Sequence, residues 1–344
     1  MSQRRAVSLP CCNNPCQRWI VETMGNSGND NPRNHGLDFL KGIAACCIVF
    51  IHVVFPWPYG VFIAYLGSFA VSVFFMTSGY YSLDASRGKL LHSIRRTVVY
   101  LLVAYVLYLF KMLAVNGFDV RTVVDFLTRE VFTLEHLLKT LITSQSRICF
   151  VAWFLISLII CYVIKLILGK KMRYLGYLGI IAGIVVSLPP VNTHMDFPIS
   201  NPWMWGIPFF VMGELVHEHE TELRHVFKRP LLVALCLLGI VLNLLSRYYG
   251  AGWWHIANML IAPSLFMLFS WSGMKFNRFC LLGSTYAFFI YIVHPLVSTY
   301  YDALRGNPGV LESWLRPIIV LACTVLLAIT YYHVKSRLVA RWRH

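Results

Sequence analysis

Apolar residues in this chain occur in long blocks separated by short polar segments, and this pattern continues from Asp38 almost to the C-terminus. Most of the blocks are long enough for a helix to cross a hydrocarbon core of about 30 Å. An even number of crossings would place both ends of the chain on the same side of the membrane. The pattern therefore predicts an all-α polytopic membrane protein of about ten transmembrane helices. The expected spans are 38–56, 64–83, 96–115, 149–168, 174–190, 203–216, 230–247, 254–272, 283–301 and 314–334.

Composition agrees with a membrane protein and argues against a soluble one. The 344 residues are 58% hydrophobic and 13% charged, and their mean hydropathy is +0.62. A net charge of +15 would suggest nucleic acid binding in a soluble protein. Here the basic residues lie between apolar blocks, so we expect the lipid bilayer as the partner and no nucleic acid.

The distribution of Lys and Arg predicts the orientation in the membrane. The expected outer loops 57–63 and 191–202 contain neither residue, whereas the opposite loops and the C-terminal end are basic. Cytoplasmic loops carry an excess of Lys and Arg, so we expect both termini in the cytoplasm. The basic residues on that side are Arg87, Lys89, Arg95, Arg96, Lys170, Lys171, Arg173, Arg224, Lys228, Arg229, Lys275, Arg278, Lys335, Arg337, Arg341 and Arg343.

The two ends of the chain differ from the apolar region between them. Residues 1–36 are polar and rich in Asn and Gly, without the pattern of a signal peptide, and we expect a disordered cytoplasmic tail. The membrane domain is expected at 37–337, followed by a basic cytoplasmic tail at 338–344. Three closely spaced cysteines in residues 1–36 could suggest a metal site, but no second ligand cluster follows at a matching spacing. They are Cys11, Cys12 and Cys16. We expect reduced thiols there and no metal.

The longest outer connection, 116–147, carries an interrupted apolar stripe among charged residues. Such a stripe is typical of a helix that lies on the membrane surface. A lid over an outward-facing pocket is an equally good interpretation, and the sequence leaves both open.

The first expected span contains the strongest candidate for chemistry. Lys41 and His52 are eleven residues apart, so a helix places them on one face within about 20° and roughly 16 Å apart along its axis. Asp38 falls about 40° to the side of the same face. An ionisable residue within a span is costly and usually faces a protein interior or a wet cavity. His52 is therefore the first candidate for a functional residue.

The ninth expected span presents a second histidine. A helix places Ser284, Tyr291, His294 and Ser298 on one face, and Pro295 leaves the carbonyl of Tyr291 without its helical hydrogen bond. His294 lies about 16 Å above the start of its span and His52 about 21 Å above Asp38, so the two imidazoles are expected at similar depth. Two inward-facing histidines at the same depth could belong to one catalytic site. The alternative is that either one is a hydrogen-bonded core residue.

Other polar positions within the spans favour packing. In the second span a face of Ser68, Ser72, Phe75, Gly79 and Ser82 is expected to let helices approach closely. Asn243 and Asn258 are expected to form hydrogen bonds between helices. Glu214 is expected to pair with a basic residue of a loop.

Five sequence blocks together resemble the acyltransferase-3 family of bacterial membrane O-acyltransferases. They are LDFLKGIAA (37–45) leading to His52, FAVSVFFMTSGY (69–80), WFL (153–155), PFFVMG (208–213) and STYAFFIYIVHP (284–295). The family pattern has Arg where this chain has Lys41, which keeps the charge but loses the planar fork of a guanidinium. It also often has His at the position of Val151, so no catalytic role passes to that residue.

The resemblance implies a multi-pass protein of the bacterial inner membrane that transfers an acyl group, most often acetyl. The donor would be cytoplasmic acyl-CoA, and the acceptor a hydroxyl on an extracytoplasmic glycan, glycolipid or related molecule. A neutral imidazole at His52 could act as general base or carry the acyl group itself. Asp38, Lys41 and His294 complete the expected catalytic set. The expected substrate-binding residues are Ser78, Gly79, Arg95, Arg96 and Tyr291.

Two other classes of function remain open from the sequence alone. One is a non-catalytic membrane module that binds or senses a small molecule. The other is a transporter, although the chain shows no internal repeat and no paired Gly/Pro-interrupted half-spans. A homo-oligomer is also left open.

Overall fold

The computed structural model describes residues 33–188, 201–249, 252–305 and 309–341, and all regular secondary structure within them is helical. The elements are α2 (His35–His52), α3 (Tyr59–Gly67), α4 (Phe69–Tyr80), α5 (Arg87–Val115), α6 (Val120–Phe126), η1 (Leu127–Val131), α7 (Leu134–Thr143), α8 (Ala152–Leu168), η2 (Gly169–Lys171), α9 (Met172–Val186), η3 (Pro202–Gly206), α11 (Ile207–Glu218), α12 (Glu220–Val226), α13 (Arg229–Tyr249), α14 (Trp254–Ser270), η4 (Leu282–Tyr286), α15 (Ala287–Arg305) and α16 (Val310–Arg341).

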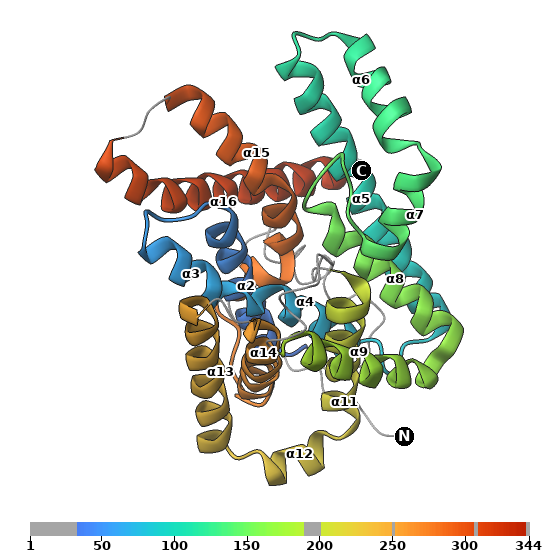
Figure 1. Ribbon diagram of the computed structural model, residues 1–344, viewed down its shortest axis with the longest axis vertical. Coiled ribbons are helices and arrows are strands. Elements are labelled where there is room, and N and C mark those ends of the chain that lie inside the picture. The colour runs from blue at the N-terminus through green and yellow to red at the C-terminus, as the bar shows by residue number, and fades with distance from the viewer. Residues whose placement is uncertain (1–32, 189–200, 250–251, 306–308, 342–344) are drawn as a thin grey trace.

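The helices surround a central group of α2, α4 and α14 (Figure 1). Helices α5 and α8 lie side by side along one flank, α13 packs against α14 on another, and α15 and α16 form a third. Helix α4 packs along both α2 and α11. The apolar core therefore lies where α2 and α4 meet the surrounding helices, and α2 carries Lys41 near its start and His52 at its exposed end.

Within the described residues, seven helical stretches are long and apolar enough to cross a membrane. They are His35–His52, Tyr59–Tyr80, Arg87–Val115, Ala152–Val186, Arg229–Tyr249, Leu282–Arg305 and Val310–Val339. The stretch Ala152–Val186 contains two of the expected spans, and Gly169 with φ +55° separates them into α8 and α9. The remaining two expected spans coincide with the shorter helices α11 and α14. Each expected span thus coincides with a helix, and a membrane protein follows; ten crossings remain a prediction.

The helical region extends beyond the domain boundaries that we expected. Asn34 caps α2, and its side chain accepts a hydrogen bond from the backbone N–H of Leu37 at 3.1 Å. Helix α2 therefore begins at His35, before the expected boundary at 37, and α16 continues to Arg341, past the expected boundary at 337. The expectations for residues 1–32, including the three tail cysteines, lie outside the described residues.

The two buried asparagines do form hydrogen bonds between helices, as their sequence context predicted. Ser68, between α3 and α4, lies 2.9 Å from Asn258 Nδ2 and 3.1 Å from Asn243 Nδ2. Asn243 also donates to the backbone carbonyl of Tyr65 at 2.8 Å. This cluster joins three segments of the chain in a region where an unpaired amide would be costly.

The prediction that Glu214 pairs with a loop residue is wrong. Its carboxylate forms an ion pair with Lys165, which lies in the last turn of α8, and both side chains are buried. Helix packing brings the last turn of α8 against α11, so the partner of Glu214 is Lys165, which lies within a span and not in a loop. Burial of the pair makes each partner necessary for the other.

The connection between α5 and α8 consists of α6, η1 and α7, which run back alongside α5 from its end (Figure 1). Helix α7 exposes most of its apolar face, including Leu134, Leu137, Leu138 and Leu141. A lid would cover apolar side chains against the protein, whereas a surface helix turns them outward into lipid. The exposure therefore favours the membrane-surface interpretation.

Close helix approach explains the small residues of the second span. A Cβ atom added at Gly79 would lie 1.8 Å from the carbonyl oxygen of Phe210, and one at Gly213 would lie 1.9 Å from the carbonyl oxygen of Met76. Glycines on α4 and α11 thus allow the two backbones to touch. This confirms the packing interpretation for Gly79.

Gly79→Ala is expected to destabilise the protein, because the added methyl group can only be accommodated by separating α4 from α11. Overpacking of this kind costs typically about 1–3 kcal/mol. The measurement is thermal unfolding of the detergent-solubilised protein. Gly88→Ala is the matched control, since a Cβ there comes no closer than 4.0 Å to another atom, and this change should be neutral or stabilising. Equal unfolding temperatures for the two variants would contradict the close contact.

Candidate functional site

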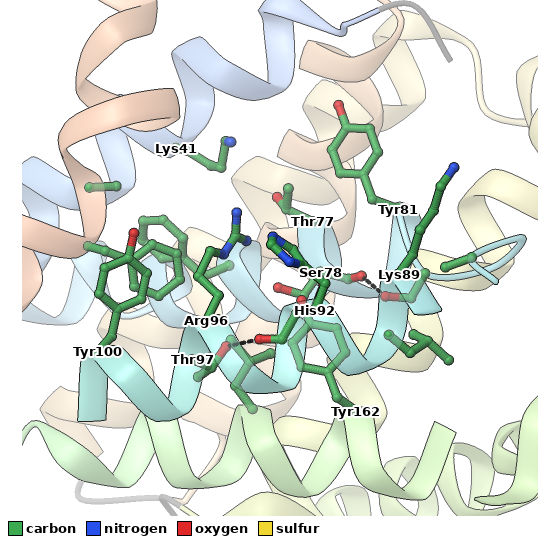
Figure 2. Close-up of a pocket in the computed structure, with 18 of the residues that line it drawn as sticks. Lys41, Thr77, Ser78, Tyr81, Lys89, His92, Arg96, Thr97, Tyr100 and Tyr162 are labelled. Atoms are coloured by element: carbon green, nitrogen blue, oxygen red, sulfur yellow. Dashed lines mark hydrogen bonds between the residues drawn. The ribbon is translucent and has the colours of Figure 1, made fainter. Parts of the chain in front are cut away.

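A cavity of about 560 Å³ lies between α2, α4, α5, α8 and the start of α15 (Figure 2). Its lining combines cationic and hydroxyl groups with aromatic and aliphatic side chains. The lining residues are Lys41, Phe74, Thr77, Ser78, Tyr81, Ser82, Ala85, Gly88, Lys89, Leu90, His92, Ser93, Arg96, Thr97, Tyr100, Phe154, Leu158, Tyr162, Gly283, Ser284, Thr285, Ala287 and Phe288.

The cationic wall comes from the first turns of α5. Lys89, His92 and Arg96 follow one another at spacings of three and four, so a helix presents them on one face. Figure 2 shows the guanidinium of Arg96 extending from α5 into the cavity, with Lys41 on the opposite side. Among the described residues, no carboxylate forms an ion pair with Arg96. The charge of Arg96 is therefore available to an anionic ligand.

Lys41 is held at the cavity by a buried carboxylate. Its Nζ lies 2.9 Å from Asp38 Oδ1, and Asp38 Oδ2 accepts a hydrogen bond from Arg33 at 2.5 Å. Asp38 is almost fully buried and is absent from the cavity lining. It therefore orients Lys41 and neutralises part of its charge, and it does not itself face the cavity.

The two histidines predicted at similar depth meet in the structure. The ring centroids of His52 and His294 are 5.3 Å apart, and their planes are inclined by 25°. Phe150, just before α8, packs edge-on against His52 at 5.0 Å. His294 is fully buried, whereas His52 at the end of α2 is exposed. The pair is thus open on the side of His52.

The hydrogen bonding of His294 determines which of its nitrogens is basic. Nδ1 lies 3.0 Å from the carbonyl oxygen of Ile290, which can only accept, so Nδ1 carries the proton in the neutral ring. Nε2 is then unprotonated, and no described residue offers it a hydrogen bond. A buried, unpartnered imidazole nitrogen beside a second histidine is suited to receive a proton or an acyl group.

The predicted site residues other than Asp38 fall into four groups. Lys41, Ser78 and Arg96 line the cavity, and His52 and His294 form the pair beyond it. Tyr291 lies between these two places, and its hydroxyl donates to the carbonyl of Val151. Gly79 and Arg95 belong to neither place. Gly79 lies in the contact with α11, and Arg95 is exposed on α5 outside the cavity.

Some residues of the site escaped the sequence prediction. The spacing of Lys89, His92 and Arg96 is visible in the sequence, but Lys89 and Arg96 also belong to the charge pattern that predicts orientation. No sequence signal distinguishes Phe150 or Phe154 from the other aromatic residues of the spans. Only the tertiary contacts of Phe154 with Phe75 of α4 and Tyr291 of α15 place its ring in the cavity lining.

Comparison with known families agrees with the sequence blocks. The profile of an acyltransferase domain, that of the acyltransferase-3 family, matches residues 34–333. The match covers most of the 344 residues, so the chain belongs to this family. It is a membrane acyltransferase. No curated protein and no solved structure matches the chain.

Proposed function

We propose that this protein transfers an acyl group, most simply acetyl, from acyl-CoA to a hydroxyl of an extracytoplasmic glycan or glycolipid. The observation that carries the proposal is the placement of the cavity and the histidines. A cation-lined cavity and a histidine pair lie along the same two helices, α2 and α15, and the pair lies outside the cavity lining.

The cavity lining suits the chemistry of coenzyme A. The nucleotide end of that molecule carries phosphates, which guanidinium and ammonium groups bind through charge-assisted hydrogen bonds. Arg96 and Lys89 supply such groups at one part of the cavity, and Lys41 supplies another. The thioester end is uncharged, and the cavity also offers the apolar rings of Phe74, Phe154 and Phe288. The donor would therefore lie with its phosphates near α5 and its acyl end toward the histidines.

The reaction needs a base from this chain. His52 would take the proton of the acceptor hydroxyl while the hydroxyl oxygen forms a bond to the thioester carbonyl carbon. The carbon–sulfur bond then breaks, and the departing thiolate receives the proton from His52. Acyl-CoA and an alcohol thus become an ester and free CoA. The alternative route has an imidazole nitrogen accept the acyl group first and pass it to the acceptor.

The proposed orientation follows from the basic residues. Lys89 and Arg96 would face the cytoplasm, where acyl-CoA is available, together with both termini of the chain. The exposed side of His52 would face the outside of a bacterial inner membrane, where the acceptor is. A homo-oligomer is compatible with this arrangement and is not needed by it.

The test uses the full chain purified into lipid nanodiscs with acetyl-CoA labelled on the acetyl group. We expect the label to move to a component of an envelope extract, with one free thiol released per acetyl group transferred. Omission of acetyl-CoA must abolish product formation. Binding of acetyl-CoA without thiol release in the presence of the extract would instead identify a non-catalytic binding module. Deletion of the gene, followed by mass comparison of the envelope glycans for a missing acetyl group, would then identify the acceptor.

A further inference from the structure

The cavity stops short of the histidines. On α15, Ala287 and Phe288 line the cavity, whereas His294 lies seven residues beyond Ala287, or about 10 Å along the helix. On α2, Lys41 lines the cavity and His52 lies about 16 Å further on. Neither histidine belongs to the cavity lining. A layer of protein therefore separates the cavity from the histidine pair.

Two aromatic side chains make up the centre of this layer. Phe154 of α8 lines the cavity, and its ring packs edge-on against Tyr291 of α15 with centroids 5.3 Å apart; Tyr291 itself is absent from the lining. The ring of Tyr291 lies 6.4 Å from that of His294 on its other side. Phe154 is 3% exposed and Tyr291 is 5% exposed. The order from the cavity to the pair is thus Phe154, Tyr291 and His294.

The layer is held by contacts that can be released. The hydroxyl of Tyr291 donates to the carbonyl of Val151, the N-cap residue at the start of α8. Pro295 lacks the N–H that would bond to the carbonyl of Tyr291, so the backbone of α15 is weakened at this residue. Phe154 is supported by the edge of Phe75 at 4.9 Å. Tyr291 is thus anchored by one side-chain hydrogen bond, next to a missing backbone hydrogen bond of α15.

We propose that Phe154 and Tyr291 form an aromatic partition that closes the cavity from the histidine pair and opens only for the acyl end of the donor. Its use rests on the proposed function, because the thioester must cross the layer to reach the base. A closed partition prevents water in the cavity from reaching the pair, and it keeps the acceptor side separate from the donor side. Phe154 and Tyr291 control access between the cavity and the histidine pair and take no part in the chemical step.

The test measures access to position 52 and does not depend on enzymatic activity. In His52→Cys, membrane-impermeant methanethiosulfonate ethyltrimethylammonium is added to proteoliposomes from one side at a time. Modification is read at position 52 by fragmentation mass spectrometry, because Cys46 and Cys47 lie on the same helix. We expect modification only from the side of the histidine pair, and not from the side of Lys89 and Arg96.

Removal of the partition should change this result. Adding Phe154→Ala is expected to raise the cavity-side rate at the introduced thiol by about tenfold or more, since truncation of a buried Phe leaves a void in the layer. Tyr291→Phe keeps the ring and removes only the bond to Val151, and it should raise the rate to a smaller extent. Phe266→Ala is the matched control, because this ring is equally buried but packs against Tyr80, and it should leave the rate unchanged.

The outcomes separate this proposal from the proposed function. Fast cavity-side modification of the introduced thiol with Phe154 and Tyr291 intact would overturn the partition, even if acyl transfer is confirmed. An equal increase with Phe266→Ala would also overturn it, because general loosening would then explain the effect. If the chain transfers no acyl group, the labelling result still decides whether the layer is closed.

Discussion

Replacing His52 with alanine is expected to lower acyl transfer by about 100- to 10,000-fold, the range that a positioned general base contributes. The loss follows from the geometry, because His52 is the exposed member of the histidine pair and the member that an acceptor reaches first. The protein should still fold, since an exposed imidazole contributes little packing. The measurement is the transfer of labelled acetyl groups by the variant in nanodiscs, at matched amounts of monodisperse protein.

His225→Ala is the control for this experiment, because it removes an equally exposed histidine of α12 that takes no part in the site. It should retain full activity. Wild-type rates in His52→Ala would remove His52 from the mechanism. His294→Ala in the same assay would then show whether its partner, whose Nε2 is unprotonated in the neutral ring, acts in its place.

Replacing Arg96 with glutamine is expected to weaken the binding of acetyl-CoA by about 10- to 100-fold. A hydrogen bond to a charged group is worth about 1.5–3 kcal/mol, and Arg96 extends its guanidinium into the cavity without a carboxylate partner among the described residues. The glutamine side chain keeps polar atoms but loses the charge. The measurement is equilibrium binding of labelled acetyl-CoA to nanodiscs at fixed ionic strength.

The chain contains its own control for Arg96. Arg95 is the adjacent residue of α5, carries the same charge and is exposed outside the cavity, so Arg95→Gln should bind acetyl-CoA normally. Equal weakening by both substitutions would indicate a general effect of surface charge or of anionic lipid. Acetyl-pantetheine, which lacks the phosphates, should bind wild-type protein and Arg96→Gln with the same affinity. A difference with that donor would contradict the assignment of Arg96 to the phosphates.

The sequence alone determined the features that follow from helix periodicity in a bilayer. The apolar blocks predicted the helices, and the rise of about 1.5 Å per residue was sufficient to place His52 and His294 at one depth. The spacing of eleven residues from Lys41 to His52 likewise predicted one face of α2, with one end at the cavity and the other at the histidine pair.

Only the tertiary structure decided which neighbours these faces meet. Arg95 and Arg96 are adjacent in the sequence, and the rotation of α5 against α8 and α15 places Arg96, but not Arg95, in the cavity lining. Gly79 is a contact residue because α4 packs against α11. Glu214 of α11 meets Lys165 because the last turn of α8 also reaches α11. The placement of Phe154 between the cavity and Tyr291 depends in the same way on how α8 lies against α15. Periodicity specifies depth and face along one helix, but rotation and contact between helices depend on the shapes of all side chains at their interfaces.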